Sequence, residues 1–313
     1  MSAPAARLPD PAADSCSARQ CYSRALPDAH WRPCSLMSGN PAALSAEALA
    51  RHLSGADLDW EIAARTASTN AELVARARLR APWRPVLLAT DEQSAGRGRQ
   101  GRAWHATPGG ALLLSLALPW SRRAAESAAV TLACGVGAAR CLEREGVRIS
   151  LKWPNDLLFE GRKLGGILTE LTEDDARAQT LVVGLGLNLF VGAEQRRAIG
   201  QPVAELAECL GYESVRVARE LWLARIALAL LRAAQEFEAL GFAPSREFFL
   251  SHCAYLGLTV CLQREGREER SGILRGVDES GRLLLENGTG TLAVNSGELS
   301  LRAVGSGKER KSP

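Results

Sequence analysis

Apolar and polar residues alternate along most of the chain in two rhythms, one typical of strands and one typical of helices. A period of two residues predicts a half-buried strand, and apolar residues three and four apart predict a helix. The two rhythms follow one another from about residue 43 to residue 255, which predicts a mixed α/β (α+β) domain. We expect strands at 60–66, 85–90, 111–118, 147–152, 157–171 (a hairpin turning near Gly161) and 180–190, and helices at 43–54, 69–80, 124–145, 202–210, 217–240 and 245–254.

The rhythm changes near Gly257, where short alternating segments are separated by Gly, Asn and Asp. Segments at 258–264, 270–277, 282–286, 291–294 and 298–303 predict a small all-β barrel. Residues 1–45 are rich in Ala, Pro, Ser and Arg and are expected to form a disordered arm, with a transit peptide or a true start at Met37 as alternatives. The predicted domains are therefore 46–255 and 256–305, followed by a polar tail at 306–313.

The composition is that of a globular protein, with 46% hydrophobic and 23% charged residues. No segment reaches the roughly 20 apolar residues that a membrane helix needs, so no membrane partner is expected. A net charge of +3 does not require a nucleic-acid partner, and no DNA binding is expected. The eight cysteines and four histidines lack zinc-site spacing, so we expect no protein-bound metal. Without a secretory signal, the cytoplasm is the expected compartment.

Lysine is rare in this chain, because 34 of the 38 basic residues are arginine. Lys308 and Lys311 fall in the polar tail, which leaves Lys152 and Lys163 as the lysines of the predicted folded body. Arginine offers a planar donor fork, whereas lysine is a compact point charge. We therefore interpret these two lysines as positions where a compact ammonium is required.

A glycine-rich loop carries the first candidate site, with the sequence Gly96-Arg97-Gly98-Arg99-Gln100-Gly101-Arg102-Ala103-Trp104. The spacing contains G-x-G-x-x-G, but the loop leads to a predicted strand and no acidic residue follows before 126, so a dinucleotide fold is excluded. Backbone N–H groups of such a loop can approach an anion, and its arginines suit phosphate or carboxylate. A solvated basic loop or an RNA-binding segment are the alternatives.

Lys152-Trp153-Pro154-Asn155-Asp156 follows a predicted strand, and Lys163-Leu164-Gly165-Gly166 follows the turn of the next hairpin. Ligands bind at strand ends in α/β folds, and an ammonium group suits a phosphate oxygen. Gly165 and Gly166 leave space for a ligand beside the backbone. The alternatives are an ordinary turn pair at Asn155-Asp156 and solvated lysines at the ends of the strands.

Two further motifs are weaker when taken alone. Gly184 and Gly186 alternate in a buried strand and predict a close approach by a ligand or another backbone, with a β-bulge as the alternative. Ser68-Thr69-Asn70 stands at a strand-to-helix junction. Thr69 and Glu72 have the spacing of a capping box, which explains Thr69 and leaves Ser68 and Asn70 to contact a ligand.

Together these motifs closely resemble the biotin protein ligase family in their order and spacing. The resemblance covers roughly residues 60–304 and includes Arg97-Gly98-Arg99-Gln100-Gly101-Arg102-x-Trp104, Lys152-Trp153-Pro154-Asn155-Asp156, Lys163-x-Gly165-Gly166 and Gly184-x-Gly186-x-Asn188. It implies a catalytic domain related to class II tRNA synthetases and lipoate ligases, followed by an SH3-like C-terminal domain. It further implies that biotin and ATP, with Mg²⁺, form biotinyl-5′-AMP, and that biotin passes to one lysine of a biotin carboxyl carrier domain.

The resemblance also assigns roles to individual residues. Lys163 and Arg97 become catalytic candidates, and the glycine loop is expected to close over the ligand. The transfer step consumes a neutral amine, and we hypothesise that Asp156, a third catalytic candidate, or Lys163 by repulsion helps to supply it. Phe190 stands where many members have a second Asn, which leaves the nucleotide contact there open. The resemblance places Ser68, Thr69, Asn70, Gln93, Gly96, Arg97, Arg99, Lys163, Gly165, Gly166 and Gly186 at biotin, and Arg102, Trp104, Lys152, Asn155, Asn188 and Arg302 at ATP.

Several alternatives stay open at this stage. No N-terminal winged helix is recognisable, so the chain resembles the monofunctional class, and the family contains both monomers and homodimers. A lipoate or octanoyl ligase or transferase shares the fold and is the nearest rival. A nucleic-acid-binding regulator would need a recognition helix or a strongly basic face. A carrier-binding module without activity is the remaining alternative.

Overall fold

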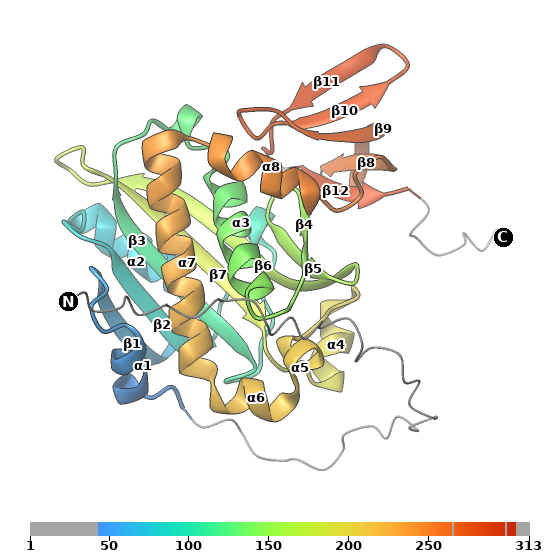
Figure 1. The fold of residues 1–313 in the computed structure, drawn as a ribbon. Helices are drawn as coiled ribbons and strands as arrows, with labels where there is room; N and C mark the ends of the chain where they lie inside the picture. The colour runs from blue at the N-terminus through green and yellow to red at the C-terminus, as the bar shows by residue number, and fades with distance from the viewer. Residues whose placement is uncertain (1–42, 265, 298, 305–313) are drawn as a thin grey trace, which may run out of the picture. The chain divides into compact units, whose positions relative to one another are not determined.

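A seven-stranded mixed sheet forms the centre of the computed structural model, which describes residues 43–264, 266–297 and 299–304. The strand order is β1-β2-β3-β7-β6-β5-β4 (Figure 1). Strands β1 and β2 pair in parallel, and the other neighbours pair antiparallel. The strands are β1 (Asp59–Thr66), β2 (Val86–Gln93), β3 (Ala111–Trp120), β4 (Ser150–Lys152), β5 (Asp156–Phe159), β6 (Arg162–Glu173) and β7 (Gln179–Asn188).

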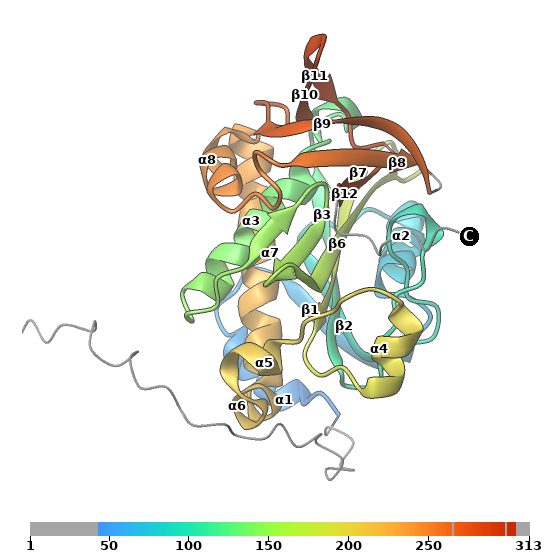
Figure 2. The same ribbon diagram turned by 90° about the vertical axis from the view of Figure 1, so that its right-hand side faces the viewer.

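Helices cover both faces of this sheet (Figure 2). The long helices α3 and α7 lie against one face, and their apolar side chains join the main buried core. Helix α2 covers the other face, where Leu73 and Val74 pack on Leu88 and Val182. The helices are α1 (Ala46–His52), α2 (Thr69–Leu79), α3 (Val130–Glu143), α4 (Ala193–Ile199), α5 (Leu206–Leu210), α6 (Tyr212–Val217), α7 (Arg219–Leu240) and α8 (Ala243–Ser251).

The C-terminal segments form a separate five-stranded antiparallel sheet, in the order β11-β10-β9-β8-β12. Its apolar side chains alternate, as at Leu283 and Leu285, which are both buried. The predicted fold class, an α/β domain followed by a small all-β unit, is confirmed. The strands are β8 (Thr259–Arg264), β9 (Arg267–Val277), β10 (Leu283–Asn287), β11 (Gly290–Val294) and β12 (Ser300–Ala303).

Some helix predictions are wrong in detail. The predicted helix at 202–210 is helical only from Leu206, because residues 202–204 are extended and bond to the backbone of Lys163. Helices α4 and α6 were not predicted, since both are short and present few apolar residues. Residues 124–126 form a separate 3₁₀ turn before α3 rather than its first turn.

The predicted helix cap at Thr69 is also wrong by one residue. Ser68 is the N-cap of α2, and its hydroxyl accepts a hydrogen bond from the backbone N–H of Ala71. Thr69 is the first helical residue, so its hydroxyl is available for contacts inside the sheet. Glu72 accepts from Thr66 and from Arg76 instead of closing a capping box.

None of the described helices is long and apolar enough to cross a membrane. The predictions for residues 1–45 and 306–313 fall almost entirely outside the described residues.

Candidate functional site

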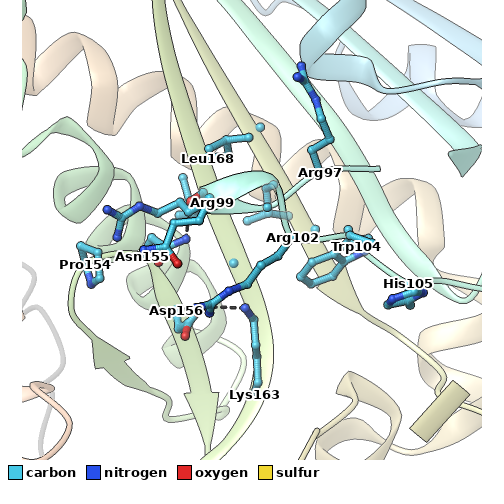
Figure 3. A pocket seen from close by; sticks show the side chains of 18 of the residues that line it. Arg97, Arg99, Arg102, Trp104, His105, Pro154, Asn155, Asp156, Lys163 and Leu168 are labelled. Carbon is cyan, nitrogen blue, oxygen red and sulfur yellow. Dashed lines mark hydrogen bonds and ion pairs between the residues drawn. The ribbon is translucent and has the colours of Figure 1, made fainter. Parts of the chain in front are cut away.

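A cavity of about 380 Å³ opens where the ends of β4, β6 and β7 meet the start of α2 and the loop after β2 (Figure 3). Residues of β12 and the segment before it complete its wall. The cavity therefore gathers motifs that lie far apart in the sequence. Its lining contains most of the predicted site residues: Ser68, Thr69, Asn70, Gln93, Arg97, Arg99, Arg102, Trp104, Lys152, Asn155, Asp156, Lys163, Gly166, Gly186, Asn188 and Arg302.

A carboxylate between two ammonium groups lies on the β4–β6 side of this cavity. The Oδ1 of Asp156 is 2.7 Å from Nζ of Lys163, and its Oδ2 is 3.3 Å from Nζ of Lys152. Strand pairing creates this contact, because β4 and β5 place Lys152 opposite Asp156, which in turn pairs with Gly166. Both predicted body lysines thus reach one carboxylate.

Burial and charge shift the pKa values in this cluster. Burial would raise the pKa of Asp156, but Lys163 and Lys152 outweigh it and hold that pKa below its ordinary value. Burial lowers the pKa of Lys152, and Asp156 opposes that shift only in part. The carboxylate is therefore ionised at neutral pH and compensates the positive charge of the site.

A chain of buried hydroxyl and amide groups occupies the α2 side of the cavity. The Oγ1 of Thr69 lies 2.7 Å from Oγ of Ser115, which donates to Oδ1 of Asn70 at 2.6 Å. Gln93 accepts from the N–H of Thr69, and its Oε1 shares the single hydroxyl hydrogen of Thr69 with Ser115. The expectation that capping accounts for Thr69 is wrong, because Ser68 caps the helix while Thr69 belongs to this network. Contact of Ser68 and Asn70 with a ligand stays a prediction. Such a fully bonded network presents fixed polar groups to a ligand.

Two glycines of β7 make room for side chains rather than for another backbone. A Cβ on Gly184 would lie 2.0 Å from Oδ1 of Asn70, and one on Gly186 would lie 2.5 Å from the indole of Trp104. The pairing of β7 with β3 and β6 is regular at both glycines, which excludes the alternative of a bulge. Nε1 of Trp104 is buried and has no hydrogen-bond partner among the described residues.

The glycine-rich loop folds as a narrow hairpin in which Arg97 and Ala103 pair. Gly98 N–H donates to the carbonyl of Arg102, and Gln100 and Gly101 turn with positive φ. Arg102 extends toward Asp156 and Lys163, whereas Arg97 points away from them (Figure 3). The catalytic role of Arg97 therefore stays a prediction that this arrangement does not support. Closing of the loop over a ligand also stays a prediction.

Arg99 ties the same loop to the C-terminal sheet. Its guanidinium donates to the carbonyls of Ser296 and Leu299, both at 3.4 Å, and to that of Gly297. Burial and Arg102 lower the pKa of Arg99, and Asp156 opposes that shift. Arg99 is thus anchored at the edge of the cavity.

Asn188 supports the catalytic lysine candidate from the end of β7. Its Nδ2 donates to the carbonyl of Lys163 at 3.3 Å and to that of Ala204 at 3.0 Å. The backbone of Lys163 also pairs with residues 202 and 204. The amide therefore joins β6 to this extended segment, and no hydrogen bond to its Oδ1 is found among the described residues at the cavity that it lines.

Gly96 and Gly165 do not line the cavity, unlike the other predicted site residues. A Cβ on Gly165 would lie 2.8 Å from the carbonyl oxygen of Gly186, so close strand packing accounts for this glycine. A Cβ on Gly96 would lie 2.9 Å from Nε2 of Gln93. Phe190 packs on Tyr212 with ring centroids 4.6 Å apart and does not line the cavity.

Several lining residues escaped the sequence analysis. Ser115 is the centre of the buried network, and its signal was a single hydroxyl in the otherwise apolar strand β3. His105 follows Trp104 and carried no signal of its own. Ile199, Gln201 and Val203 also line the cavity. Of these, Val203 falls within the helix predicted at 202–210.

Comparison with known proteins gives the class of this fold and site. The model for the biotin/lipoate A/B protein ligase family matches residues 62–188, and that for the biotin protein ligase C terminal domain matches residues 255–302. The biotin–[acetyl-CoA-carboxylase] ligase of Paracoccus denitrificans is 34% identical over 247 residues, covering 75% of this chain and 98% of the relative. The chain belongs to the biotin protein ligase family.

Further relatives extend this comparison. The enzyme of the same name from Mycobacterium tuberculosis is 31% identical over 82% of this chain and 95% of the relative. The bifunctional ligase/repressor BirA of Escherichia coli is 35% identical, but the match covers 65% of that protein. A solved biotin protein ligase from Aquifex aeolicus, in complex with biotin and ATP, has a TM-score of 0.63 at 26% identity, covering 78% of this chain and 99% of that one.

Proposed function

We propose that this chain is a biotin–[acetyl-CoA-carboxylase] ligase that joins biotin to ATP and then transfers it to a carrier lysine. One observation carries the proposal: Lys163, Asp156 and Lys152 share one cavity with the Thr69–Ser115–Asn70 network. A bonded polar pocket suits the uncharged ring end of biotin, and a cationic end suits a carboxylate and phosphates.

In the first step, a biotin carboxylate oxygen bonds to the α-phosphorus of ATP while the bond to pyrophosphate breaks. A carboxylate is already ionised at neutral pH, so this step needs no general base. It does need cations, because the carboxylate and the triphosphate repel one another. Lys163 and Arg102 supply this charge in the proposal, since both face the cavity (Figure 3). Fixed charges aimed at the reacting centre are an effective form of catalysis.

Magnesium enters this proposal as part of the nucleotide substrate. Asp156 is the one carboxylate among the described residues that line the cavity, and both of its oxygens are paired with lysines. The described residues contain no group of three or more His, Cys, Asp or Glu side chains that could hold a metal ion. The proposal therefore assigns the ion to the nucleotide, and none of its steps runs through the ion.

In the second step, the carrier lysine nitrogen bonds to the biotinyl carbonyl carbon while the bond to AMP breaks. The nitrogen must be neutral, although the reference pKa of lysine is about 10.4. We propose that Lys163 disfavours a second ammonium nearby, and that Asp156 holds Lys163 in place and helps to orient the incoming amine.

A lipoate ligase is the second candidate, because the matching family model includes both activities. The named relatives and the C-terminal domain model favour biotin. A DNA-binding regulator has support in the names of several relatives, among them the E. coli ligase/repressor. The predicted absence of a winged helix concerns residues 1–42, outside the described residues.

The remaining parts of the proposal concern the setting of the enzyme. The acceptor is a biotin carboxyl carrier domain, as the names of the relatives suggest. A cytoplasmic location fits the described cysteines, which are free thiols. A monomer and a homodimer are both compatible with the fold.

The proposal is tested by incubating the protein with biotin, MgATP and a biotin carboxyl carrier domain, followed by a streptavidin blot. We expect a biotinylated carrier only when all components are present. A parallel pyrophosphate-exchange assay compares biotin with lipoate. Exchange with lipoate but not biotin would replace the proposal with the second candidate, and exchange with neither would refute both.

A further inference from the structure

A second cavity, of about 290 Å³, lies beside the first and shares a wall with it. Its remaining walls come from the turn before α3, the middle of β6 and two loops of the C-terminal sheet. Strand β5 pairs with β6 only as far as Gly166, which leaves the next residues of β6 free to form a wall. The residues that line both cavities are Arg99, Trp153, Pro154, Asn155, Ile167 and Leu168.

The two cavities differ sharply in charge. Arg99 is the one charged side chain among the described residues that line the second cavity, and three of its five N–H groups donate to backbone carbonyls. The hydroxyls of Thr131 and Thr169 pair with each other at 2.6 Å. That of Ser127 is bonded to Trp120 and Arg123. The lining is therefore mixed: Val130, Leu132, Leu171 and Leu181 supply apolar surface beside these bonded hydroxyls and the loops of the C-terminal sheet.

We propose that this second cavity admits the acceptor lysine to the acyl-adenylate, an inference that rests on the proposed function. A lysine side chain has a four-carbon apolar stem that suits such a lining. Burial in a cavity whose described lining has no carboxylate favours the neutral amine over the ammonium, and the charge of Arg99 acts in the same direction. Neutral amine is the form that the transfer step consumes.

The bonds of this step balance without a further reactant. The ammonium loses one proton to solvent as it enters the cavity. The neutral nitrogen then bonds to the biotinyl carbonyl carbon, and the bond from that carbon to the phosphate oxygen of AMP breaks. The second proton leaves the nitrogen with the departing phosphate.

The same lining argues against pyrophosphate as the occupant. An anion of that charge needs several cations, and this lining offers one among the described residues, Arg99, whose guanidinium is already bonded to Ser296, Gly297 and Leu299. Lys152, Lys163 and Arg102 all line the first cavity and do not line the second. The first cavity therefore binds the phosphates, and the second is left for a group that is neutral when it reacts.

Ala128 allows the proposal to be tested without touching the first cavity. It is exposed, lines the second cavity only, and lies between the 3₁₀ turn and α3. In Ala128→Phe the new ring projects into the cavity. We expect kcat/KM for a biotin carboxyl carrier domain to fall at least tenfold, while biotin-dependent pyrophosphate exchange stays within twofold of wild type.

Ala125→Phe is the matched control, because Ala125 is also exposed but lines neither cavity. It should leave both assays unchanged. Unchanged carrier transfer in Ala128→Phe would overturn the proposal, as would a parallel loss of exchange, which would make the cavity part of the adenylation site or a route for pyrophosphate. A wild-type protein without biotin-dependent exchange would instead refute the proposed function.

Discussion

The Nζ of Lys163 lies 2.7 Å from Oδ1 of Asp156, so the cation proposed to meet the phosphates is already paired with a carboxylate. Lys152 binds the other oxygen of the same carboxylate. Three charged groups therefore hold one another in place, and the cluster carries a net positive charge. A triphosphate entering the cavity meets cations whose positions are set before it binds, which is the arrangement that lowers the cost of reorganisation.

Lys163→Ala should reduce biotin-dependent pyrophosphate exchange by about 10²–10³-fold, the range for removal of one preorganised electrostatic group. Lys163→Arg should also be strongly impaired. The lysine fits between Asp156 and the face of Trp104, with Nζ 5.7 Å from the ring centroid, and a longer planar guanidinium would not occupy the same point. Near-normal exchange in the arginine variant would show that the rarity of lysine reflects composition alone.

Asp156→Asn should slow transfer of biotin from preformed biotinyl-AMP to the carrier domain, because Lys163 loses the carboxylate that positions it. Single-turnover transfer measured from pH 6 to pH 9 tests this. A wild-type rate across that range would exclude a role for Asp156 in transfer.

The same substitution should lower the free energy of unfolding by about 3 kcal/mol at pH 7, since it removes one partner from a mostly buried cluster. The folded-state pKa of Asp156 lies below its ordinary value, so this stabilisation is fully present above the unfolded value of about 3.9. It is lost as pH falls through the lower folded value. The difference between wild type and variant should therefore be constant from pH 7 to pH 5 and shrink below pH 4 in urea titrations.

Glu213→Gln provides the control for this measurement. Glu213 pairs with Arg216 on the surface of α6, and the exposed fraction of its side chain is 62%. Such pairs contribute little, so the control should change stability by less than about 0.5 kcal/mol.

The sequence predicted the strands and the positions of the motifs better than the contacts between residues of different motifs. Strand periodicity located Lys152 and Lys163 at strand ends, which the structure confirms. Their meeting at Asp156 depends on the register of β4, β5 and β6, which includes a shift between Leu157 and Leu158 that regular alternation does not predict.

The buried network and the extended segment at 202–204 could not be predicted for a related reason. Ser68 and Thr69 compete for the same cap position, and the pairing of Thr69 with Ser115 across 46 residues decides between them. Pro202 and Val203 are poor helix formers, and pairing of residues 202–204 with the backbone of Lys163 holds the segment extended. Tertiary contacts therefore decide both features, and at 202–204 they agree with the local preference.

Gly184→Ala should disrupt the polar end of the cavity, because the new Cβ would lie 2.0 Å from Oδ1 of Asn70. Asn70 would have to move and leave Ser115, so we expect a stability loss of about 1–3 kcal/mol from overpacking. We also expect at least tenfold weaker biotin binding by calorimetry. Gly192→Ala is the matched control, since nothing lies within 4 Å of its added Cβ and its φ of −65° suits alanine. Equal behaviour of the two variants would contradict a binding role for the network.

Asn188 offers a prediction that separates positioning from nucleotide contact. Its Nδ2 bridges the carbonyls of Lys163 and Ala204, while its Oδ1 is left for the cavity. Asn188→Asp keeps an acceptor for the nucleotide but sets a carboxylate against two carbonyls. If positioning dominates, Asn188→Asp should be less stable and slower in pyrophosphate exchange than Asn188→Ala.

Asn188→Ala itself should lose about 1–3 kcal/mol of stability, the cost of leaving a buried polar partner unsatisfied. The exposed Asn295→Ala serves as control and should stay within about 0.5 kcal/mol of wild type. The decisive comparison is between Asp and Ala at residue 188. Higher exchange activity in Asn188→Asp than in Asn188→Ala would mean that the acceptor oxygen, and hence contact with the nucleotide, is the main role of this side chain.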